Sequence, residues 1–283
     1  MKIVMITGAN SGIGFETAWA LARRDYRIIM VCRNREKAEE AREKIIRQSG
    51  NQKIEILIGD LSSREEVLDI ASQYCVKYKK LDILINNAGI IPGEREETVD
   101  GIEKTLAVNH LAPFLLTNKL LNPLLNAEEA RVITVSSEAH KAGKFEPDNL
   151  QLNIGYNSLK AYANSKLFNI MFANELAQRF NHTPVTSYSL HPGTVRTNIH
   201  SGGSGYSLFS FLLKLGRPFM RSPKRGAKTS VYLATEPGIE TLNGNYFVDE
   251  KVEDPLEIAF DREKCRQLWE ISETLTIKWD KTL

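Results

Sequence analysis

KIVMITGANSGIG, residues 2–14, decides the fold of this 283-residue chain. Its first apolar residues read as a short strand, and the glycines that follow have the spacing GxxxGxG instead of the better-known GxGxxG. Gly8 allows a tight turn off the strand, Gly12 lets the backbone approach a pyrophosphate, and Gly14 lets the next helix pack closely on the sheet. The stretch therefore predicts the opening unit of a dinucleotide-binding fold, with an ordinary tight turn as the alternative.

Short apolar runs alternate with longer amphipathic stretches along the rest of the chain. The runs are apolar throughout, which suits parallel strands covered on both faces. We therefore predict an α/β chain, a single-domain Rossmann fold over residues 1–283 with a doubly wound, mostly parallel sheet of about seven strands flanked by helices. Strands are expected at residues 2–6, 27–31, 53–58, 81–85, 131–135 and 185–190, and helices at 12–24, 35–48, 64–78, 101–121 and 158–179.

Composition argues against several classes of protein. Lys and Arg total 37 against 35 Asp and Glu, a net charge of +2 that gives no support to a nucleic-acid partner. Cys32, Cys75 and Cys265 are far apart and form no CxxC pair, so we expect no metal site and no disulfide framework. We see neither a signal peptide nor an apolar run of about 18 residues. The expected location is therefore cytoplasmic, with a peripheral membrane contact and a homodimer left open.

The residues after the second and third expected strands bear on the choice of dinucleotide. A free ribose 2′-hydroxyl is bound by a carboxylate, and a 2′-phosphate by a cation. Arg33 follows the second strand, and no carboxylate comes before Glu36. Arg33 therefore predicts NADPH or NADP⁺, the alternative being an arginine at the start of a helix without a ligand. Asp60 and Leu61 follow the third strand, where Asp60 can accept from an adenine amino group and Ser62 can cap a helix.

Small and polar residues mark the ends of the fourth and fifth expected strands. NNAG, residues 86–89, allows a cofactor to approach the backbone, and its two amides can tie strand ends together; a simple turn is the alternative. Ser136 and Ser137 directly follow the fifth strand, so their hydroxyls emerge at the carboxyl edge, where open α/β sheets bind ligands.

Tyr162 and Lys166 are four residues apart in the expected helix 158–179, so both side chains share one helical face. An ammonium beside a phenol lowers a phenol pKa that is normally near 10. This pair favours an acid–base role for Tyr162 near neutral pH, the alternative being a solvated helix face.

Seven motifs occur in the order found in the short-chain dehydrogenase/reductase family. They are TGANSGIG (7–14), DLS (60–62), NNAG (86–89), NHLAPF (109–114), VSS (135–137), YANSK (162–166) and HPGTVRT (191–197). The similarity covers nearly the whole chain. Within the family, the chain most resembles the retinol-dehydrogenase-like and WW-domain-containing-oxidoreductase-like subgroup.

The resemblance implies a site and a reaction. Asn109, Ser137, Tyr162 and Lys166 would be the catalytic tetrad, with Ser136 as the rival of Ser137. Hydride would pass between NADP(H) and a carbonyl carbon, with Tyr162 giving the proton, Ser137 a hydrogen bond, and Asn109 holding a water beside Lys166. His191 is expected to pack or hydrogen-bond near the cofactor edge. The expected cofactor-binding residues are Gly8, Asn10, Ser11, Gly12, Ile13, Gly14, Arg33, Asp60, Leu61, Asn87, Ala88, Gly89, Tyr162, Lys166, Pro192, Gly193 and Thr197.

The family places a substrate lid at about residues 199–222. Here SGGSG, residues 201–205, precedes a segment rich in Leu and Phe. The segment favours a small hydrophobic carbonyl or alcohol as substrate, of retinoid, steroid or lipid type; a structural cover, a membrane contact or a subunit contact are the alternatives. Two other functions stay open: an NADP(H)-binding regulatory protein without turnover, and a nucleotide-sugar epimerase.

Overall fold

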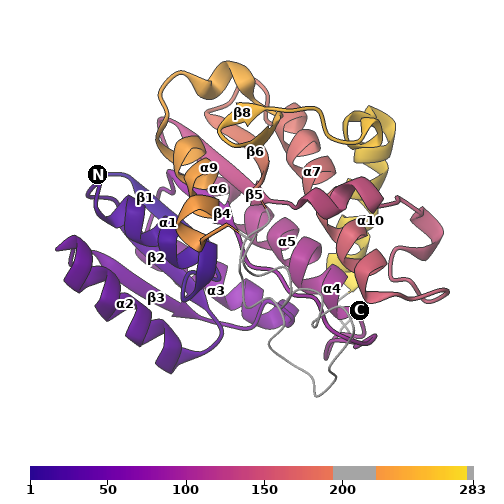
Figure 1. The fold of residues 1–283 in the computed structure, drawn as a ribbon, viewed down its shortest axis with the longest axis horizontal. Helices are drawn as coiled ribbons and strands as arrows, with labels where there is room; N and C mark the ends of the chain where they lie inside the picture. The colour runs from indigo at the N-terminus through magenta and orange to yellow at the C-terminus, as the bar shows by residue number, and fades with distance from the viewer. Residues whose placement is uncertain (194–220, 279–283) are drawn as a thin grey trace.

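One sheet of eight strands runs through the computed structural model, which describes residues 1–193 and 221–278, with side chains to residue 276 (Figure 1). The order is β3-β2-β1-β4-β5-β6-β7-β8, and every neighbouring pair is parallel except β7 and β8. The predicted doubly wound, mostly parallel sheet is confirmed. The strands are β1 (Ile3–Thr7), β2 (Arg27–Cys32), β3 (Ile54–Ile58), β4 (Ile83–Asn86), β5 (Ala130–Val135), β6 (Val185–His191), β7 (Tyr246–Val248) and β8 (Lys251–Val252).

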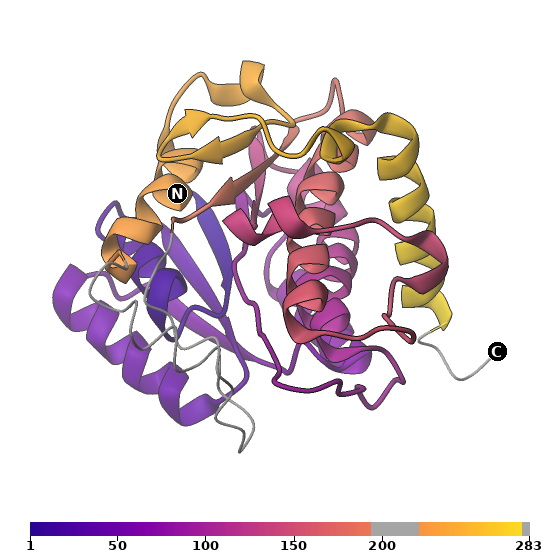
Figure 2. The same ribbon diagram turned by 45° about the vertical axis from the view of Figure 1, so that its right-hand side comes forward.

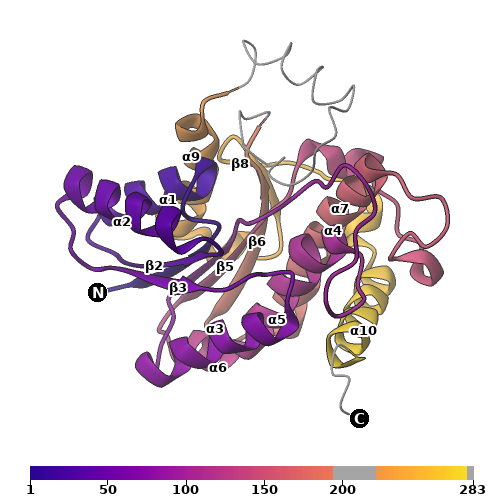
Figure 3. The same ribbon diagram turned by 90° about the horizontal axis from the view of Figure 1, so that it is seen from below.

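Helices cover both faces of the sheet and form a three-layer structure (Figure 3). One face buries a core of apolar side chains under α1 (Gly12–Ala22), α2 (Arg35–Ser49) and α9 (Pro223–Thr235). The other face buries a core under α3 (Arg64–Lys77), α4 (Lys104–Leu106), α5 (Ala112–Lys119), α6 (Leu121–Leu125), α7 (Ser158–Arg179) and α10 (Arg262–Lys278). Figure 2 shows α10 packed along α7. Burial on both faces explains why the strands are apolar throughout.

Short helical turns also occur within the described residues. They are the π-helical turn η1 (Ala107–Leu111) and the 3₁₀ turns η2 (Glu138–Ala142), η3 (Pro147–Asn149), η5 (Ile239–Leu242) and η6 (Glu257–Phe260).

Polar side chains cap the long helices. Asn34 accepts a bond from Lys37 N at 2.8 Å at the start of α2, and Asn157 caps α7. The expected cap at Ser62 is wrong, because Ser63 caps α3. The Ser62 hydroxyl instead donates to Asp60 Oδ1 at 2.8 Å.

The expected helix 101–121 is interrupted. Helical structure begins at Lys104 and passes through the π turn η1. Pro113 lies in the first turn of α5 and has no N–H, so it cannot give Asn109 the bond that a continuous α-helix would supply. The interruption therefore falls on a residue of the predicted tetrad, as π-helical turns often do at functional sites.

The register of the sheet aligns the carboxyl ends of its central strands. Thr7 pairs with Val31 and Asn86 with Thr134. Val135 pairs with Leu190. The segments that follow β1, β2, β4, β5 and β6 therefore leave the sheet along one edge. Nearly every residue predicted to bind a cofactor or substrate comes from these segments or from the one after β3.

Candidate active site

The glycine loop after β1 lies against the segment after β4. A Cβ on Gly14 would be 2.4 Å from the Gly8 carbonyl oxygen and 2.6 Å from Asn87 Nδ2. Gly8 and Gly12 have φ angles of +68° and +56°, which favour glycine. The close approach of α1 to β1 thus requires the glycines at the positions that the sequence indicated.

The start of α1 has the features of an anion site. Ser11, its N-cap, is exposed, and its side chain makes no capping bond within the described chain. No acidic residue lies in the first turn, Asn10 is half-buried and Ile13 is buried. A helix N-terminus without a carboxylate or a side-chain cap suits a phosphate group, so the loop fits the pyrophosphate of a dinucleotide.

Thr7 joins the two loops, a role that the sequence did not predict. Its Oγ1 accepts bonds from Asn87 N and Ala88 N, both at 3.0 Å, while Asn87 Nδ2 donates to Thr7 O at 2.8 Å. Asn87 therefore ties the end of β4 to the end of β1, as predicted. Asn86 differs, because its Nδ2 donates to Thr117 Oγ1 on α5 at 3.1 Å. The only hint of this role in the sequence is that Thr7 is the first residue of the TGANSGIG motif.

Arg33 and Asp60 lie side by side at the ends of β2 and β3. Arg33 Nη1 is 3.4 Å from Asp60 Oδ2, and the Arg33 side chain is 58% exposed. Asp60 Oδ1 accepts from Ser62 N at 2.8 Å, and Leu61 is buried. An exposed guanidinium held by a weak surface pair remains able to bind a phosphate.

Asn109 is fully buried and binds the backbone after β4. Its Oδ1 accepts from Ile90 N at 2.8 Å, and its Nδ2 donates to Ile90 O and to Ser165 Oγ, both at 3.0 Å. A Cβ on Gly89 would be 3.3 Å from Lys166 Nζ and 3.5 Å from Asn109 Oδ1. The NNAG segment is thus held directly against two residues of the predicted tetrad.

Ser136 and Ser137 have different surroundings. The buried Ser136 hydroxyl donates to Lys166 O at 2.7 Å and is used in holding α7 to β5. Ser137 is half-buried, accepts from Ala139 N at 3.2 Å, and lies close enough to the Tyr162 phenol to lower its pKa. Of the two serines, Ser137 is the one placed to act beside Tyr162.

Lys166 and Tyr162 face each other on α7. Lys166 is 3% exposed, and its Nζ donates to Val135 O at 3.0 Å and lies 5.5 Å from the centre of the Tyr162 ring. Burial lowers the pKa of Lys166 to about 8. Burial also raises the pKa of Tyr162, although the Ser137 hydrogen bond opposes this. The expected lowering of the Tyr162 pKa is therefore wrong for this structure, because desolvation is the largest influence on the phenol.

Replacing Lys166 with methionine should raise the free energy of unfolding at pH 7. The shift of the Lys166 pKa from 10.5 to about 8 corresponds to at most about 3 kcal/mol of burial cost. The Val135 carbonyl keeps a partner, because Asn169 Nδ2 donates to it at 3.2 Å. The unfolded chain binds more protons than the folded one between pH 8 and 10.5, so the advantage of Lys166→Met should disappear across that range. Denaturant unfolding at several pH values measures it, and a less stable variant at pH 7 would contradict it.

The segment after β6 carries the remaining predicted residues. Pro192 and Gly193 are half-buried, and Gly193 has a φ of +82°. Thr197 and residues 199–220 of the predicted lid lie outside the described residues. His191 accepts bonds at Nδ1 from Glu138 N at 3.1 Å and Gly193 N at 3.3 Å. It therefore connects the segment after Ser137 to the segment after β6.

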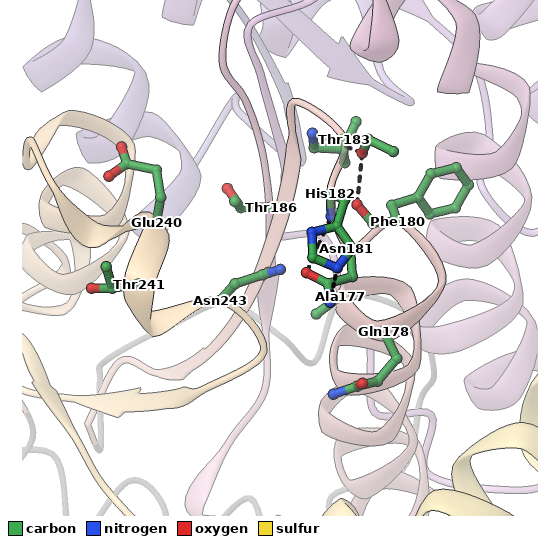
Figure 4. A pocket seen from close by; sticks show the side chains of 11 residues that line it. Ala177, Gln178, Phe180, Asn181, His182, Thr183, Thr186, Glu240, Thr241 and Asn243 are labelled. Carbon is green, nitrogen blue, oxygen red and sulfur yellow. Dashed lines mark hydrogen bonds between the residues drawn. The ribbon is translucent and has the colours of Figure 1, made fainter.

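A hollow of about 380 Å³ lies at the opposite edge of the sheet, between the end of α7 and the start of β6 (Figure 4). Asn181, His182, Thr183, Glu240 and Asn243 are among its lining residues. Several of its polar groups bond within the hollow, such as Thr183 Oγ1 to Phe180 O at 2.7 Å. None of the predicted site residues lines this hollow. The predicted site residues within the described part of the chain lie instead toward the carboxyl edge of the sheet.

Other kinds of site find no support in the described residues. No group of three His, Cys, Asp or Glu side chains within residues 1–193 and 221–278 could hold a metal ion. Within the same ranges, no helix has the length and apolar character needed to cross a bilayer. Burial raises the pKa of Cys32 and Cys265 to about 12, so neither is a ready thiolate.

Comparison with known proteins identifies the family. The short chain dehydrogenase family matches residues 2–202. The chain belongs to the short-chain dehydrogenase family. Membership confirms the oxidoreductase class that the motifs indicated.

Individual members of the short-chain dehydrogenase family are similar over almost the entire chain. Retinol dehydrogenase 12 of Bos taurus is 41% identical over 282 residues, covering 99% of this chain and 88% of that protein. Retinol dehydrogenase 14 of Homo sapiens is 40% identical, covering 97% and 86%. These relatives confirm the retinol-dehydrogenase-like subgroup.

Solved structures show the same fold. An uncharacterised protein from Mycobacterium paratuberculosis is 31% identical, with a TM-score of 0.79 and coverage of 98% of this chain and 94% of that one. A short chain dehydrogenase from Escherichia coli CFT073, complexed with NADPH, has a TM-score of 0.69 at 24% identity, covering 88% and 97%. At that identity the second likeness supports the fold alone.

Proposed function

We propose that this protein is an NADP(H)-dependent oxidoreductase that interconverts a hydrophobic carbonyl compound and its alcohol. The observation that carries the proposal is the assembly of Asn109, Ser137, Tyr162 and Lys166 at the carboxyl edge of the sheet, beside the glycine loop. Lys166 is a charged group whose burial is costly and shifts its pKa, and ionisable groups perturbed in this way gather at functional sites. Gly89 brings the NNAG segment against both Lys166 and Asn109.

The proton chemistry follows from the surroundings of Tyr162. Because burial raises its pKa, the phenol carries its proton at neutral pH and can donate from Oη to a carbonyl oxygen that is being reduced. Ser137, which lies beside the same phenol, can donate a hydrogen bond to that oxygen as negative charge develops there. The bound nicotinamide would supply the hydride.

Lys166 and Asn109 would assist Tyr162 and Ser137 without donating to the substrate themselves. Lys166 Nζ, held by Val135 O, would bind the nicotinamide ribose and bring positive charge close to the phenol. Pro113 deprives the Asn109 carbonyl of an α-helical donor, which leaves that oxygen suited to hold a water that connects Lys166 to solvent. Together they would return a proton to Tyr162 after each turnover.

The retinol dehydrogenases that match nearly the whole chain support a retinoid alcohol or aldehyde as the substrate. The sequence after residue 205 is rich in Leu and Phe, which agrees with an apolar substrate. Steroid and lipid carbonyl compounds would fit this feature as well as a retinoid. We expect purified protein with NADPH to reduce all-trans-retinal faster than short-chain aldehydes. Absence of turnover with retinal, a steroid ketone and a long-chain aldehyde would refute the activity.

A dinucleotide-binding regulatory role is the second candidate. Calorimetric titration with NADPH separates it from the enzyme: tight binding without turnover of any of these carbonyl compounds would favour the regulatory role. The buried and connected tetrad favours the enzyme.

Replacing Arg33 with aspartate should reverse the preference for NADPH. The variant loses a charged partner for the 2′-phosphate and gains a carboxylate suited to a free 2′-hydroxyl. Hydrogen bonds to charged groups contribute about 1.5–3 kcal/mol, so the KM for NADPH should rise at least about tenfold while that for NADH falls.

Steady-state kinetics with both cofactors measure this change. Arg47→Asp, the same change of charge near the other end of α2, should leave the ratio of the two KM values unaltered. An unchanged ratio in Arg33→Asp would contradict the role of Arg33.

A further inference from the structure

The peptide group that follows Ser137 is bonded on both sides by imidazoles. Its carbonyl, Ser137 O, lies 2.8 Å from His140 Nδ1. Its amide, Glu138 N, donates to His191 Nδ1 at 3.1 Å. The two histidines come from different elements, His140 from η2 and His191 from the end of β6. The peptide is thus held by side chains from two separate parts of the chain.

The two bonds require opposite protonation of Nδ1. A carbonyl oxygen only accepts, so His140 must carry a proton on Nδ1. An amide N–H only donates, so His191 Nδ1 must carry a lone pair and its proton must be on Nε2. That Nε2 faces the Glu138 carboxylate at 3.4 Å, and the same lone-pair nitrogen also receives Gly193 N at 3.3 Å. The geometry therefore fixes the tautomer of each ring.

We propose that His140 and His191 are positioning residues that clamp the Ser137–Glu138 peptide and so hold Ser137 Oγ beside Tyr162, and that a proton on His191 opens this clamp. The inference rests on the proposed function and adds two residues and a pH response to it. Neither histidine touches the reacting atoms.

The surroundings hold both rings in place. His140 is fully buried, and its ring packs edge-on against Tyr246 of β7, with the ring centres 5.1 Å apart. His191 is 7% exposed and lies between β5 and β7, paired with Val248. Rings packed in this way cannot turn away without disturbing the end of the sheet.

The position of Ser137 Oγ depends on this backbone. Ser137 caps the start of η2, and its Oγ accepts from Ala139 N, so rotation of the next peptide would move the hydroxyl. A misplacement of about 1 Å in an active site can cost 100-fold in rate. His191 additionally links this peptide to Gly193, where the nicotinamide side of the cofactor is expected.

Charges around His191 act in both directions. Glu138 of η2 and Asp249 of the β7–β8 turn favour the protonated ring, whereas His140 and Arg221 disfavour it. Burial is the largest influence and lowers the pKa of His191, and it lowers that of His140 as well. Arg221 is itself held by Asp249, with Nη2 at 2.8 Å from Oδ2, so the two largely offset each other. Both rings are therefore neutral at pH 7, as the clamp requires.

Protonation affects the two histidines differently. A proton added to His140 goes to Nε2 and leaves the Nδ1–H bond to Ser137 O intact. A proton added to His191 goes to Nδ1 and places an N–H against the N–H groups of both Glu138 and Gly193. Loss of the clamp in acid should therefore depend on His191 alone.

Four variants test the clamp by kinetics with NADPH and all-trans-retinal. His140→Leu and His191→Leu remove the imidazole bonds, although Ser137 O keeps the backbone bond from N of residue 140 at 3.0 Å, and we expect kcat to fall about 10-fold to 100-fold. Asparagine can replace Nδ1 as either donor or acceptor, so His140→Asn and His191→Asn should recover kcat to within about threefold of wild type. The KM for NADPH should rise in His191→Leu only, because only His191 bonds Gly193.

The pH profile separates positioning from a general packing role. Wild-type kcat should fall on the acid side as His191 takes up a proton, and His191→Asn should lose that fall because an amide does not titrate. His140→Asn should keep it. Leucine variants with wild-type kcat, or an acid limb unchanged in His191→Asn, would overturn the clamp.

Amide hydrogen exchange gives a readout that does not need turnover. In the wild-type protein the Glu138 and Gly193 amides should be protected near pH 7, and His191→Leu should lose this protection while β1 amides keep theirs. If no carbonyl compound is reduced, the proposed function fails, but exchange still decides the clamp. Equal exchange at Glu138 in wild type and His191→Leu would refute it.

Discussion

Tyr162→Phe is expected to lower kcat for carbonyl reduction at least about 100-fold while leaving NADPH affinity nearly unchanged. General acid–base groups contribute typically 100-fold to 10,000-fold, and the phenol is the proposed proton donor. The phenyl ring keeps the packing of α7 and the contact with Lys166, which lies 5.5 Å from the ring centre. The substitution therefore removes the proton and little else.

Tyr156→Phe is the matched control for this experiment. Tyr156 lies in the segment before α7, and its hydroxyl donates to Glu94 O at 3.2 Å. The Tyr156→Phe variant also loses a phenol oxygen, but not one in the tetrad. Its kcat should therefore remain within about twofold of wild type. Single-turnover kinetics with NADPH and retinal, together with calorimetric titration of NADPH, measure both quantities. An active Tyr162→Phe protein would contradict the assignment of the proton donor.

The sequence predicted the elements that depend on local signals. Helix α7 begins at Ser158 and ends at Arg179, as expected, since Asn157 caps its start. The common edge of the site was also predictable, because parallel strands bring their carboxyl ends together and the motifs follow those ends. Gly14, identified from its spacing, indeed approaches Gly8.

Features that depend on contacts between distant segments were not predictable. The π turn at Asn109 forms where its side chain binds Ile90, nineteen residues earlier. Strands β7 and β8 have only three and two residues, too few to show a periodicity. The pKa of Tyr162 depends on how deeply α7 packs, and the proposed clamp by His140 and His191 requires β6 to lie beside β5. In each case the sequence shows the residue types but does not show the tertiary contact on which the feature depends.

Gly14→Ala is expected to abolish measurable NADPH binding and to lower the free energy of unfolding by about 3 kcal/mol. The added Cβ would be 2.4 Å from the Gly8 carbonyl oxygen and 2.6 Å from Asn87 Nδ2. Neither atom can move easily, because one is backbone and the other donates to Thr7 O at 2.8 Å. Helix α1 must therefore shift away from β1, and the N-terminus that is suited to the pyrophosphate shifts with it.

Two other glycines make this a graded test. Gly93→Ala adds the same methyl group where nothing lies within 4 Å, so binding and stability should match wild type. Gly89→Ala places the methyl 3.3 Å from Lys166 Nζ, the mobile end of a side chain, so it should reduce NADPH affinity and activity with little loss of stability. Calorimetric titration with NADPH and denaturant unfolding rank the three variants by cofactor affinity and by stability. If Gly14→Ala bound NADPH as tightly as Gly93→Ala does, the cofactor would not lie on the glycine loop, and the site proposed at this edge of the sheet would lose its basis.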